Sequence, residues 1–254
     1  MELRCEKVFP KSEINFHCAS CQNTLPLRKN FATSGSRMNN DVIDDVFKIL
    51  EAQVSSWQEP VVSRISREKN PFKILISTVL SLRTKEKTTG EASNRLFNMA
   101  STPGKMLELP LSTIEKAIYP VGFYKSKAIN IIRISKIILQ EYNGRVPDNM
   151  DDLLKLPGVG RKTANLVVIL GFKGMGICVD THVHRITNRW GYVITNTPHE
   201  TEIRLREILP ERYWKQINDF LVSYGQNLCV PISPYCSRCK LRAYCDQIGI
   251  KHYR

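Results

Sequence analysis

Two residues near the middle of the chain have side chains that could do covalent chemistry, Lys162 and Asp180. Lys162 follows the stretch Leu156-Pro-Gly-Val-Gly-Arg at the start of a helix-like run. A helix N-terminus is already positive, and a cation placed there costs up to about 1 kcal/mol. An anion arriving at this turn would offset that cost. The segment Val-Asp-Thr-His follows 18 residues later, and its Asp180 can cap a helix that opens at Thr181.

Each of these features also has a plain structural interpretation. Gly158 and Gly160 allow tight backbone geometry, and free N–H groups followed by a helix N-terminus form an anion pocket. The same turn could be an ordinary corner between helices with a solvated lysine, because short motifs are frequent by chance. Asp180 could act only as a cap, or also as a carboxylate that manages protons beside a nucleophilic Lys162. These two roles of Asp180 are compatible.

The ionisation of Lys162 decides what a nucleophilic role would require. A free lysine has a pKa of about 10.4, so only about one amine in 10³ is neutral at pH 7. The helix dipole lowers that pKa by less than about one unit, whereas a nearby carboxylate and phosphates raise it. We therefore expect a cavity that holds water when empty and becomes dry when a substrate fills it.

A second cluster of reactive residues lies near the C-terminus. Four cysteines there follow the pattern C-x6-C-x2-C-x5-C, namely Cys229, Cys236, Cys239 and Cys245. Four thiolates in one short loop strongly indicate a metal site, and their spacing alone fits zinc and a [4Fe–4S] cluster about equally well. Basic side chains lie among them, which suits contacts with phosphates: Arg238, Lys240 and Arg242.

The composition agrees with a polyanionic partner. The 254 residues are 42% hydrophobic, enough for a sizeable core, and carry a formal net charge of +13. This balance fits nucleic acid, an anionic membrane surface or acidic substrates. No apolar run approaches the roughly 18 residues that cross a bilayer, and no signal-peptide pattern opens the chain. We therefore expect an intracellular protein without a membrane span, and eight cysteines are too few for a disulfide scaffold.

Helical spacing of apolar residues dominates the chain after residue 38, and alternating strand patterns are nearly absent. The sequence therefore predicts an all-α fold. Helices are expected at 42–50, 72–80, 128–142, 163–172, 200–209 and 211–224. Proline and glycine pairs separate them.

Residues 1–37 differ from the rest and are predicted to be a poorly structured extension. Cys5, Cys18 and Cys21, with His17 nearby, could form a small zinc knuckle, but a single C-x2-C pair is a weak signal and an incidental segment is the other interpretation.

Three further candidates receive structural interpretations. His182 and His184 are two residues apart, which is poor spacing for metal ligands on a helix, so we expect hydrogen-bonded structural histidines. Cys178 is expected to be a small buried hydrophobic residue.

Taken together, the hairpin, the Val-Asp-Thr-His segment and the cysteine pattern resemble the endonuclease III family of helix-hairpin-helix DNA glycosylases, from about residue 40 to 246. The resemblance implies a six-helix domain at 64–174 that carries the hairpin. It also implies a second helical domain, built from 38–63 and 175–254, that carries a [4Fe–4S] cluster. The active-site cleft would lie between the two domains.

The resemblance also implies roles for individual residues. Lys162 matches the nucleophile that forms a Schiff base, Asp180 matches the catalytic carboxylate, and the four cysteines match the cluster ligands. The hairpin residues that would grip a phosphate of double-stranded DNA are Leu156, Pro157, Gly158, Val159 and Gly160. Family members extrude a damaged nucleotide, displace its base from C1′ with the lysine, and cut on the 3′ side of the abasic site by β-elimination.

The lysine also favours one substrate class. Relatives that act on adenine or thymine mismatches generally lack a lysine here and use water, so we expect a bifunctional glycosylase and lyase that removes oxidised pyrimidines. Arg83 stands where many members place glutamine, and it could fill the gap left by the flipped base or only contact phosphate. The alternatives are a mismatch-directed glycosylase and a non-catalytic iron-sulfur protein that binds DNA regardless of lesions. We expect a monomer, and a cytoplasmic, nucleoid-associated location if the source is prokaryotic.

Overall fold

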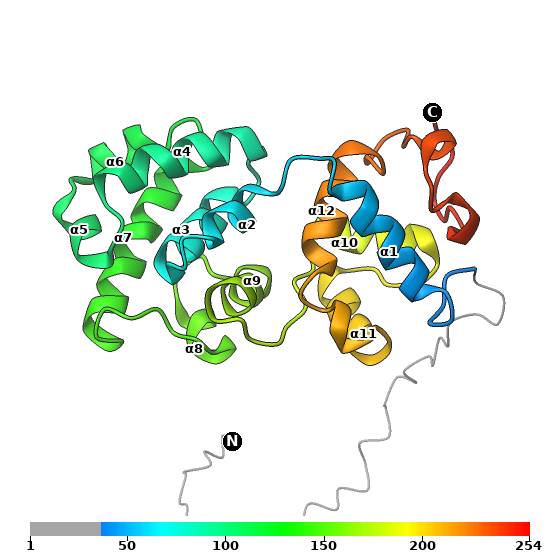
Figure 1. Cartoon of the computed structure of the whole chain (residues 1–254). Helices are drawn as coiled ribbons and strands as arrows, with labels where there is room; N and C mark the ends of the chain where they lie inside the picture. Colours follow the sequence, from blue (N-terminus) through cyan, green and yellow to red (C-terminus); the bar gives the residue numbers. More distant parts are fainter. Residues whose placement is uncertain (1–36) are drawn as a thin grey trace, which may run out of the picture. The chain divides into compact units, whose positions relative to one another are not determined.

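The computed structural model describes residues 37–254, which belong to one compact unit. Residues 1–36 lie outside the described part, and with them lie nearly all of the predicted extension and the zinc knuckle considered at Cys5, Cys18 and Cys21. Within the described part all regular structure is helical and no strand occurs (Figure 1). The predicted all-α fold is therefore confirmed.

Twelve α-helices and three short 3₁₀ helices make up the described part. The α-helices are α1 (Ile43–Val54), α2 (Val61–Ser66), α3 (Pro71–Ser81), α4 (Glu86–Met99), α5 (Pro103–Glu108), α6 (Leu111–Ile118), α7 (Tyr124–Glu141), α8 (Met150–Lys155), α9 (Arg161–Phe172), α10 (Thr181–Trp190), α11 (Pro198–Ile208) and α12 (Ile217–Asn227). The 3₁₀ helices are η1 (Glu211–Tyr213), η2 (Cys236–Arg238) and η3 (Arg242–Tyr244).

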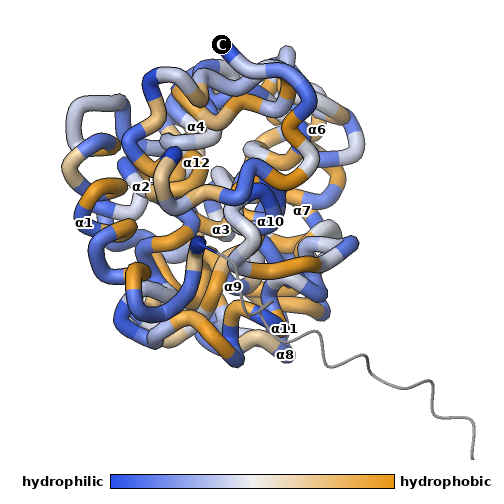
Figure 2. Tube along the Cα trace, turned by 90° about the vertical axis from the view of Figure 1, so that its right-hand side faces the viewer, coloured by the Kyte–Doolittle hydropathy of each residue, from blue (hydrophilic) through white to orange (hydrophobic). Residues whose placement is uncertain are grey.

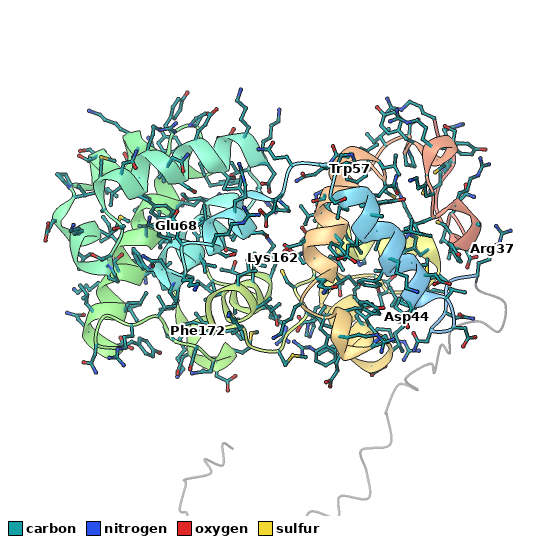
Figure 3. The ribbon with its side chains drawn as sticks, viewed as in Figure 1. Arg37, Asp44, Trp57, Glu68, Lys162 and Phe172 are labelled. Carbon is teal, nitrogen blue, oxygen red and sulfur yellow. The ribbon has the colours of Figure 1, made fainter. Side chains whose placement is uncertain are left out.

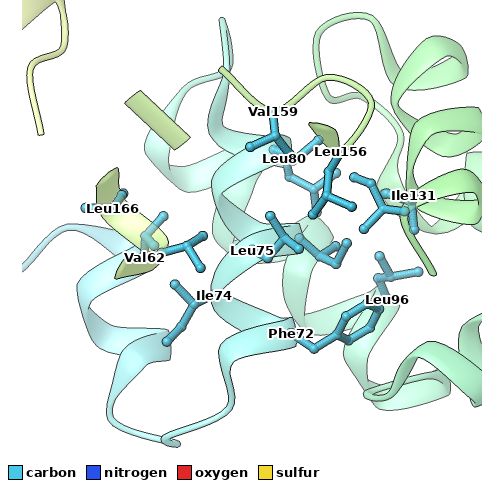
Figure 4. Close-up of a cluster of buried hydrophobic side chains, with 14 of the residues drawn as sticks. Val62, Phe72, Ile74, Leu75, Leu80, Leu96, Ile131, Leu156, Val159 and Leu166 are labelled. Atoms are coloured by element: carbon cyan, nitrogen blue, oxygen red, sulfur yellow. The ribbon is translucent and has the colours of Figure 1, made fainter. Parts of the chain in front are cut away.

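Helix α3 lies at the centre of the first of two hydrophobic clusters (Figure 4). Its residues are apolar around most of the helix, and Leu75 and Leu80 are fully buried. A helix that is apolar on all sides belongs in a core, and α3 packs against α2, α4, α7 and α9. Its N-terminus is fixed by Asn70, whose side chain accepts hydrogen bonds from the backbone N–H groups of Phe72 and Lys73.

The second hydrophobic cluster is formed by α1, α10, α11 and α12 together with the C-terminal loop. Its buried aromatic residues are Phe47, Trp190, Tyr192 and Tyr224. Figure 2 shows hydrophobic and hydrophilic segments alternating along the helices, as expected where each helix has one buried face. None of the described helices is both long and apolar enough to cross a membrane.

The chain changes from one cluster to the other at residues 177–179. Cys178 packs in the first cluster, whereas Ile177 and Val179 pack in the second. The connection between α9 and α10 is therefore part of both cores. The division into domains at 64–174 and at 38–63 with 175–254 stays a prediction.

One predicted helix is wrong in part. The segment 211–224 is interrupted: η1 covers Glu211–Tyr213, and α12 begins only at Ile217. Between them the indole N–H of Trp214 donates to the carbonyl oxygen of Leu209 at 2.8 Å, and the Trp214 ring packs against the guanidinium of Arg206. The chain turns at Trp214 because this side chain folds back onto α11, which the periodicity of apolar residues does not reveal.

Candidate active site

A cavity of about 890 Å³ lies between residues of the two hydrophobic clusters, and it is large enough for a nucleotide-sized ligand. The two residues singled out from the sequence, Lys162 and Asp180, both line it. Other segments of its wall are 81–86, Phe123 and Lys127 from the first half of the chain, and residues of α12 from the second.

Lys162 lies in the first turn of α9, where it faces the cavity half-buried (Figure 3). Within residues 37–254 its ammonium makes no ion pair with a carboxylate. Its carbonyl oxygen lies 3.5 Å from the Sγ of Cys178, which is completely buried as the sequence predicted. Burial raises the pKa of the Cys178 thiol to about 12, so this thiol is an inert packing group behind the lysine.

Asp180 is the N-cap of α10, which confirms the predicted cap. Its Oδ1 accepts hydrogen bonds from the backbone N–H groups of His182 at 2.8 Å and Val183 at 2.9 Å. Both bonds go to the same oxygen. The capping bonds therefore leave the other carboxylate oxygen for a ligand in the cavity, so capping and chemistry are compatible.

The predicted hairpin connects α8 to α9. Gly158 has a φ of +77°, and a Cβ at this position would lie 2.6 Å from the side-chain nitrogen of Asn130, so the turn requires glycine. The side chains of Leu156 and Val159 are buried in the first cluster and anchor the turn. Any contact of this turn with a phosphate therefore comes from its backbone. Helix α9 has no side-chain cap at Gly160, which leaves its first N–H groups available to an anion.

A buried carboxylate with no signal in the local sequence holds this end of α9. Glu202 on α11 is 3% exposed and accepts two hydrogen bonds from Arg161, at 2.7 and 3.0 Å. Asn165 and Arg206 also donate to it, at 3.1 to 3.2 Å. Burial opposes ionisation of Glu202, but these hydrogen bonds outweigh it and hold its pKa below the usual range. The residue next to Lys162 is therefore fastened to α11.

Arg83 and Phe123 form an exposed pair at the rim of the cavity. The guanidinium of Arg83 lies 5.8 Å from the centre of the Phe123 ring, and both residues have positive φ, at 51° and 58°. Phe123 is 64% exposed, which is unusual for a phenylalanine. The buried ammonium of Lys127 holds the Arg83 loop by donating to the carbonyl oxygens of Leu80 at 2.9 Å and Leu82 at 2.5 Å.

The sequence contained only a weak signal for Phe123 and Lys127. Phe123 precedes the apolar stripe of α7 and does not belong to it. An aromatic residue in a turn, outside the stripe of the following helix, is the pattern that could have identified it.

The two histidines are structural, as predicted. His184 Nδ1 lies 2.6 Å from the hydroxyl of Thr201, and His182 Nδ1 lies 3.1 Å from the guanidinium of Arg185. Burial lowers the pKa of both histidines. Arg185 also donates to the carbonyl oxygen of Cys229 at 2.9 Å. Because His182 lines the cavity, Arg185 connects the cavity wall to the cysteine loop.

Helices α10 and α12 approach each other closely at Gly225. A Cβ on Gly225 would lie 2.3 Å from His182 Nδ1 and 2.8 Å from the guanidinium of Arg185. No side chain fits there without moving both of these groups.

The four predicted ligand cysteines lie between the end of α12 and residue 245, and the sulfurs of three of them have hydrogen-bond partners. Arg189, a buried arginine, donates to Cys229 Sγ at 3.3 Å, and the hydroxyl of Tyr224 lies 3.0 Å from Cys239 Sγ. The backbone N–H of Gln247 donates to Cys245 Sγ at 3.4 Å. Donors pointed at sulfur, one of them cationic, suit thiolate ligands.

The electrostatic influence of the cysteine thiols on one another shows that they lie close together. Burial raises the pKa of Cys236, Cys239 and Cys245, to about 12 for Cys245, and neighbouring cysteine sulfurs contribute to each shift. The thiols thus lie near one another. Among residues 37–254 no group of three or more cysteine, histidine or carboxylate side chains has an arrangement that could hold a metal ion.

The three basic residues predicted near the thiols are on the surface. The guanidinium of Arg238 lies 4.7 Å from the Tyr235 ring centre, and that of Arg242 lies 5.1 Å from the Tyr253 ring centre. Both arginines and Lys240 are exposed, and none forms a salt bridge within the described residues. They are available to a polyanion, although the cavity wall contains none of them.

The sequence matches a known protein family. Residues 76–211 match the model of the HhH-GPD superfamily of base excision DNA repair proteins. The chain is 47% identical over 183 residues to endonuclease III of Thermotoga maritima, which covers 72% of this chain and 86% of that protein. It is 45% identical to the chloroplastic endonuclease III homolog 2 of Arabidopsis thaliana, with 68% of this chain but only 47% of the plant protein covered.

Solved structures of endonuclease III have a similar fold. The fold is similar to that of a non-covalent endonuclease III–DNA complex, with a TM-score of 0.73 and 34% identity over 82% of this chain and 95% of that one. It is also similar to a trapped covalent endonuclease III–DNA intermediate, with a TM-score of 0.67 and 37% identity over 70% of this chain and 84% of that one. A thermostable thymine-DNA glycosylase, 24% identical, shares the fold.

The Glu202 network leads to a prediction about stability. Replacing Glu202 by Gln keeps the size of the side chain but removes the charge that Arg161 and Arg206 share, and we expect the free energy of unfolding to fall by about 1–3 kcal/mol. Chemical denaturation at pH 7 measures the change. A matched control is Glu207→Gln on the same helix, whose exposed ion pair with Arg204 contributes less than about 1 kcal/mol.

The same variant has an expected pH dependence. The folded-state pKa of Glu202 is lowered, so its contribution to stability is complete above its unfolded pKa of about 4.3 and is lost as pH falls through the folded value. The difference between wild type and Glu202→Gln should therefore shrink below about pH 4. A difference that stays constant down to pH 3 would contradict this role.

Proposed function

The chain belongs to the HhH-GPD superfamily of base excision DNA repair proteins and, within it, to the endonuclease III family, and from this we propose that Lys162 is the nucleophile of a DNA glycosylase and lyase. Its partner is double-stranded DNA that contains damaged bases or abasic sites. The observation that carries the assignment is the position of Lys162 in the cavity, beside Asp180 and at the uncapped end of α9.

The reaction needs an amine that becomes neutral inside the cavity. An extruded nucleotide displaces water, and loss of water disfavours the charged ammonium. The Nζ of Lys162 then forms a bond to C1′ while the bond from C1′ to the base breaks, and its electron pair leaves with the base. The carboxylate of Asp180 stabilises the positive charge that develops on the sugar. The Schiff base then forms as the C1′–O4′ bond breaks and O4′ takes a proton from the amine. Loss of a proton from C2′ next expels the 3′ phosphate.

The backbone around Lys162 is suited to the DNA strand. The N–H groups at the start of α9 and the turn at Gly158 supply donors for a phosphate, and the helix dipole adds attraction. The same phosphate offsets the repulsion between the dipole and Lys162, which answers why a cation stands there. The basic side chains Arg238, Lys240 and Arg242 would contribute salt-dependent affinity.

Arg83 and Phe123 are suited to the gap that an extruded nucleotide leaves. An exposed apolar ring can enter between base pairs, and a guanidinium can pair with the orphaned base or stack on it. Lys127 keeps the Arg83 loop in place. We assign Phe123 as the wedge and Arg83 as the side chain that fills the vacated position.

The lysine argues against the mismatch-directed relatives, which generally lack it. A covalent amine mechanism leads to strand cleavage, and we assign oxidised pyrimidines as the bases that are removed. The alternative within the superfamily is removal of mismatched bases. A panel of duplexes with single lesions separates the two, because a mismatch enzyme leaves thymine glycol in place.

The cysteine loop is suited to a [4Fe–4S] cluster. Four thiols near one another, with hydrogen-bond partners at three of the sulfurs, suit metal ligands, and membership of the endonuclease III family favours a [4Fe–4S] cluster over one zinc ion. Cys229, Cys236, Cys239 and Cys245 would hold it. When bound, the cluster supplies covalent cross-links that fix the loop, and Arg189 fastens the same loop through the carbonyl oxygens of Val230 and Pro231.

Borohydride trapping tests the nucleophile. Wild-type protein mixed with an abasic or thymine-glycol duplex and borohydride should give a stable covalent adduct, since the reagent reduces the Schiff base. Lys162→Ala should give none, and Lys116→Ala, an exposed lysine on α6, should trap like wild type. An adduct that persists in Lys162→Ala would overturn the assignment.

Asp180 is tested with Asp180→Asn, which preserves the cap because asparagine caps helices as well as aspartate does. This variant should keep its melting temperature and its affinity for DNA but remove bases about 10²-fold more slowly. Turnover at the wild-type rate would mean that Asp180 serves only as a cap.

Phe123→Ala tests the wedge. Without the ring, extrusion from a paired duplex becomes harder, and we expect base removal to slow about tenfold, equivalent to about 1.4 kcal/mol of the unstacking energy. Removal of the same lesion from single-stranded DNA should change little. Tyr119→Ala is a matched control, because Tyr119 is also an exposed aromatic residue of this turn but does not line the cavity. An equal loss on both substrates would refute the wedge.

Metal analysis tests the cluster. Anaerobically purified protein should contain about four iron atoms and about four sulfides per chain and absorb in the visible range. Cys236→Ser should lose iron and lower the melting temperature, whereas Cys178→Ser should keep its iron because Cys178 lies in the other hydrophobic cluster. One zinc ion per chain in place of iron would contradict the proposal.

A further inference from the structure

A third carboxyl group, that of Asp219 on α12, lines the same cavity as Lys162 and Asp180. Its Oδ1 accepts a hydrogen bond from the hydroxyl of Ser63 on α2 at 2.7 Å. Because α2 belongs to the first cluster and α12 to the second, this bond crosses between them. The carboxyl group is thus held at a defined place in the cavity wall.

A short chain of contacts fixes Asp219 with respect to the reacting groups. The side-chain amide of Asn218, the preceding residue, donates to the carbonyl oxygen of Cys178 at 3.1 Å. Cys178 in turn contacts the carbonyl oxygen of Lys162 through its sulfur and is two residues from Asp180. Asp219 is therefore tied to the segment that carries both predicted catalytic groups.

The surroundings of Asp219 make its carboxyl group bind a proton more tightly than a free aspartic acid does. Within the described residues no arginine, lysine or histidine forms a salt bridge with it, and its hydrogen-bond partner is neutral. Burial raises the pKa of Asp219 to about 6, and the negative charges of Glu59 and Glu86 act in the same direction. An arriving base displaces water from the carboxyl group and raises the pKa further.

We propose that Asp219 contacts the extruded base and passes a proton to it as the bond between C1′ and the base breaks. The inference rests on the proposed glycosylase function and adds a second acid–base group to it. Attack by Lys162 leaves an electron pair on the departing base, which is a poor leaving group as an anion. A carboxylic acid beside that base neutralises it.

The protons balance within the site. The O–H bond of Asp219 breaks, its proton goes to a ring nitrogen or carbonyl oxygen of the base, and a carboxylate remains. The ammonium of Lys162 gives up two protons on the way to the Schiff base. One goes to O4′ as the C1′–O4′ bond opens, and the other restores the acid, so base removal needs no further proton donor.

Other charged groups line the same cavity, and an experiment must distinguish their titration from that of Asp219. Glu86 lines the cavity, but its carboxylate accepts a hydrogen bond from the backbone N–H of Val61 at 2.8 Å, and Glu59 pairs with Arg67. The remaining titratable or charged groups in the wall are Arg83, Lys85, Lys127, Lys162, Asp180 and His182.

The test compares two reactions of the same protein. One is removal of thymine glycol from a duplex under single-turnover conditions, and the other is cleavage of a duplex that already has an abasic site. Both depend on Lys162, but only the first has a departing base. The ratio of the two rates, followed from pH 5.5 to 8.5, therefore cancels the titration of the amine and reports on the acid.

In wild type the ratio should fall by up to about tenfold per pH unit above the pKa of Asp219, because only the protonated carboxyl group acts. Asp219→Asn should lower the ratio about 10²-fold at pH 6 and make it independent of pH, while its cleavage of abasic DNA stays within about twofold of wild type. Ser63→Ala removes a hydrogen bond that lowers the pKa of Asp219, so the fall should move to higher pH.

Three results would overturn the proposal: a wild-type ratio that does not change with pH, base removal by Asp219→Asn at the wild-type rate, or an equal loss of both reactions in that variant. A wild-type protein that cannot cleave abasic DNA would refute the glycosylase and lyase function itself. That outcome is distinct, because it does not involve Asp219.

Discussion

The site depends on one constraint: the N-terminus of α9 has no side-chain cap, and it must nevertheless be rigid where it places Lys162 in the cavity wall. The first turn of α9 has no side chain that satisfies its N–H groups, and Lys162 adds a positive charge to them. Such a turn would fray in isolation. The buried carboxylate of Glu202 prevents this from the side of α11, and Leu156 and Val159 prevent it from the side of the core. The N–H groups are thereby left for a ligand.

Elsewhere around the cavity, too, some polar groups make structural hydrogen bonds while others stay available to a ligand. Asp180 gives one oxygen to the backbone of α10, and the other is not needed for the cap. Lys127 is fully engaged with the loop that carries Arg83, so it holds a neighbour in place and is not free to bind DNA itself. In both cases the structural hydrogen bonds use particular atoms and leave other groups of the cavity wall unused. The side chains that remain available are the ones that a nucleotide would meet.

The parts that could be predicted from the sequence are those governed by short-range rules. Gly158 and Gly160 mark the turn before α9, Asp180 marks a helix start, and the all-α fold follows from the spacing of apolar residues. Glu202, Ser63 and Asp219 could not be predicted in this way, because each acts through a residue more than 30 positions away in the chain. The break before α12 has a different cause. The side chain of Trp214 folds back onto Leu209 and Arg206 at the end of α11, and the spacing of apolar residues carries no signal for this contact.

Gly225 shows how much can depend on a residue that makes no side-chain contact. At this point α10 and α12 come so close that one methyl group would displace both His182, in the cavity wall, and Arg185, which holds the carbonyl oxygen of Cys229. The cavity wall and the cysteine loop therefore both depend on the absence of a side chain at Gly225. Even the smallest substitution of Gly225, by alanine, would disturb the cavity wall and the cysteine loop together.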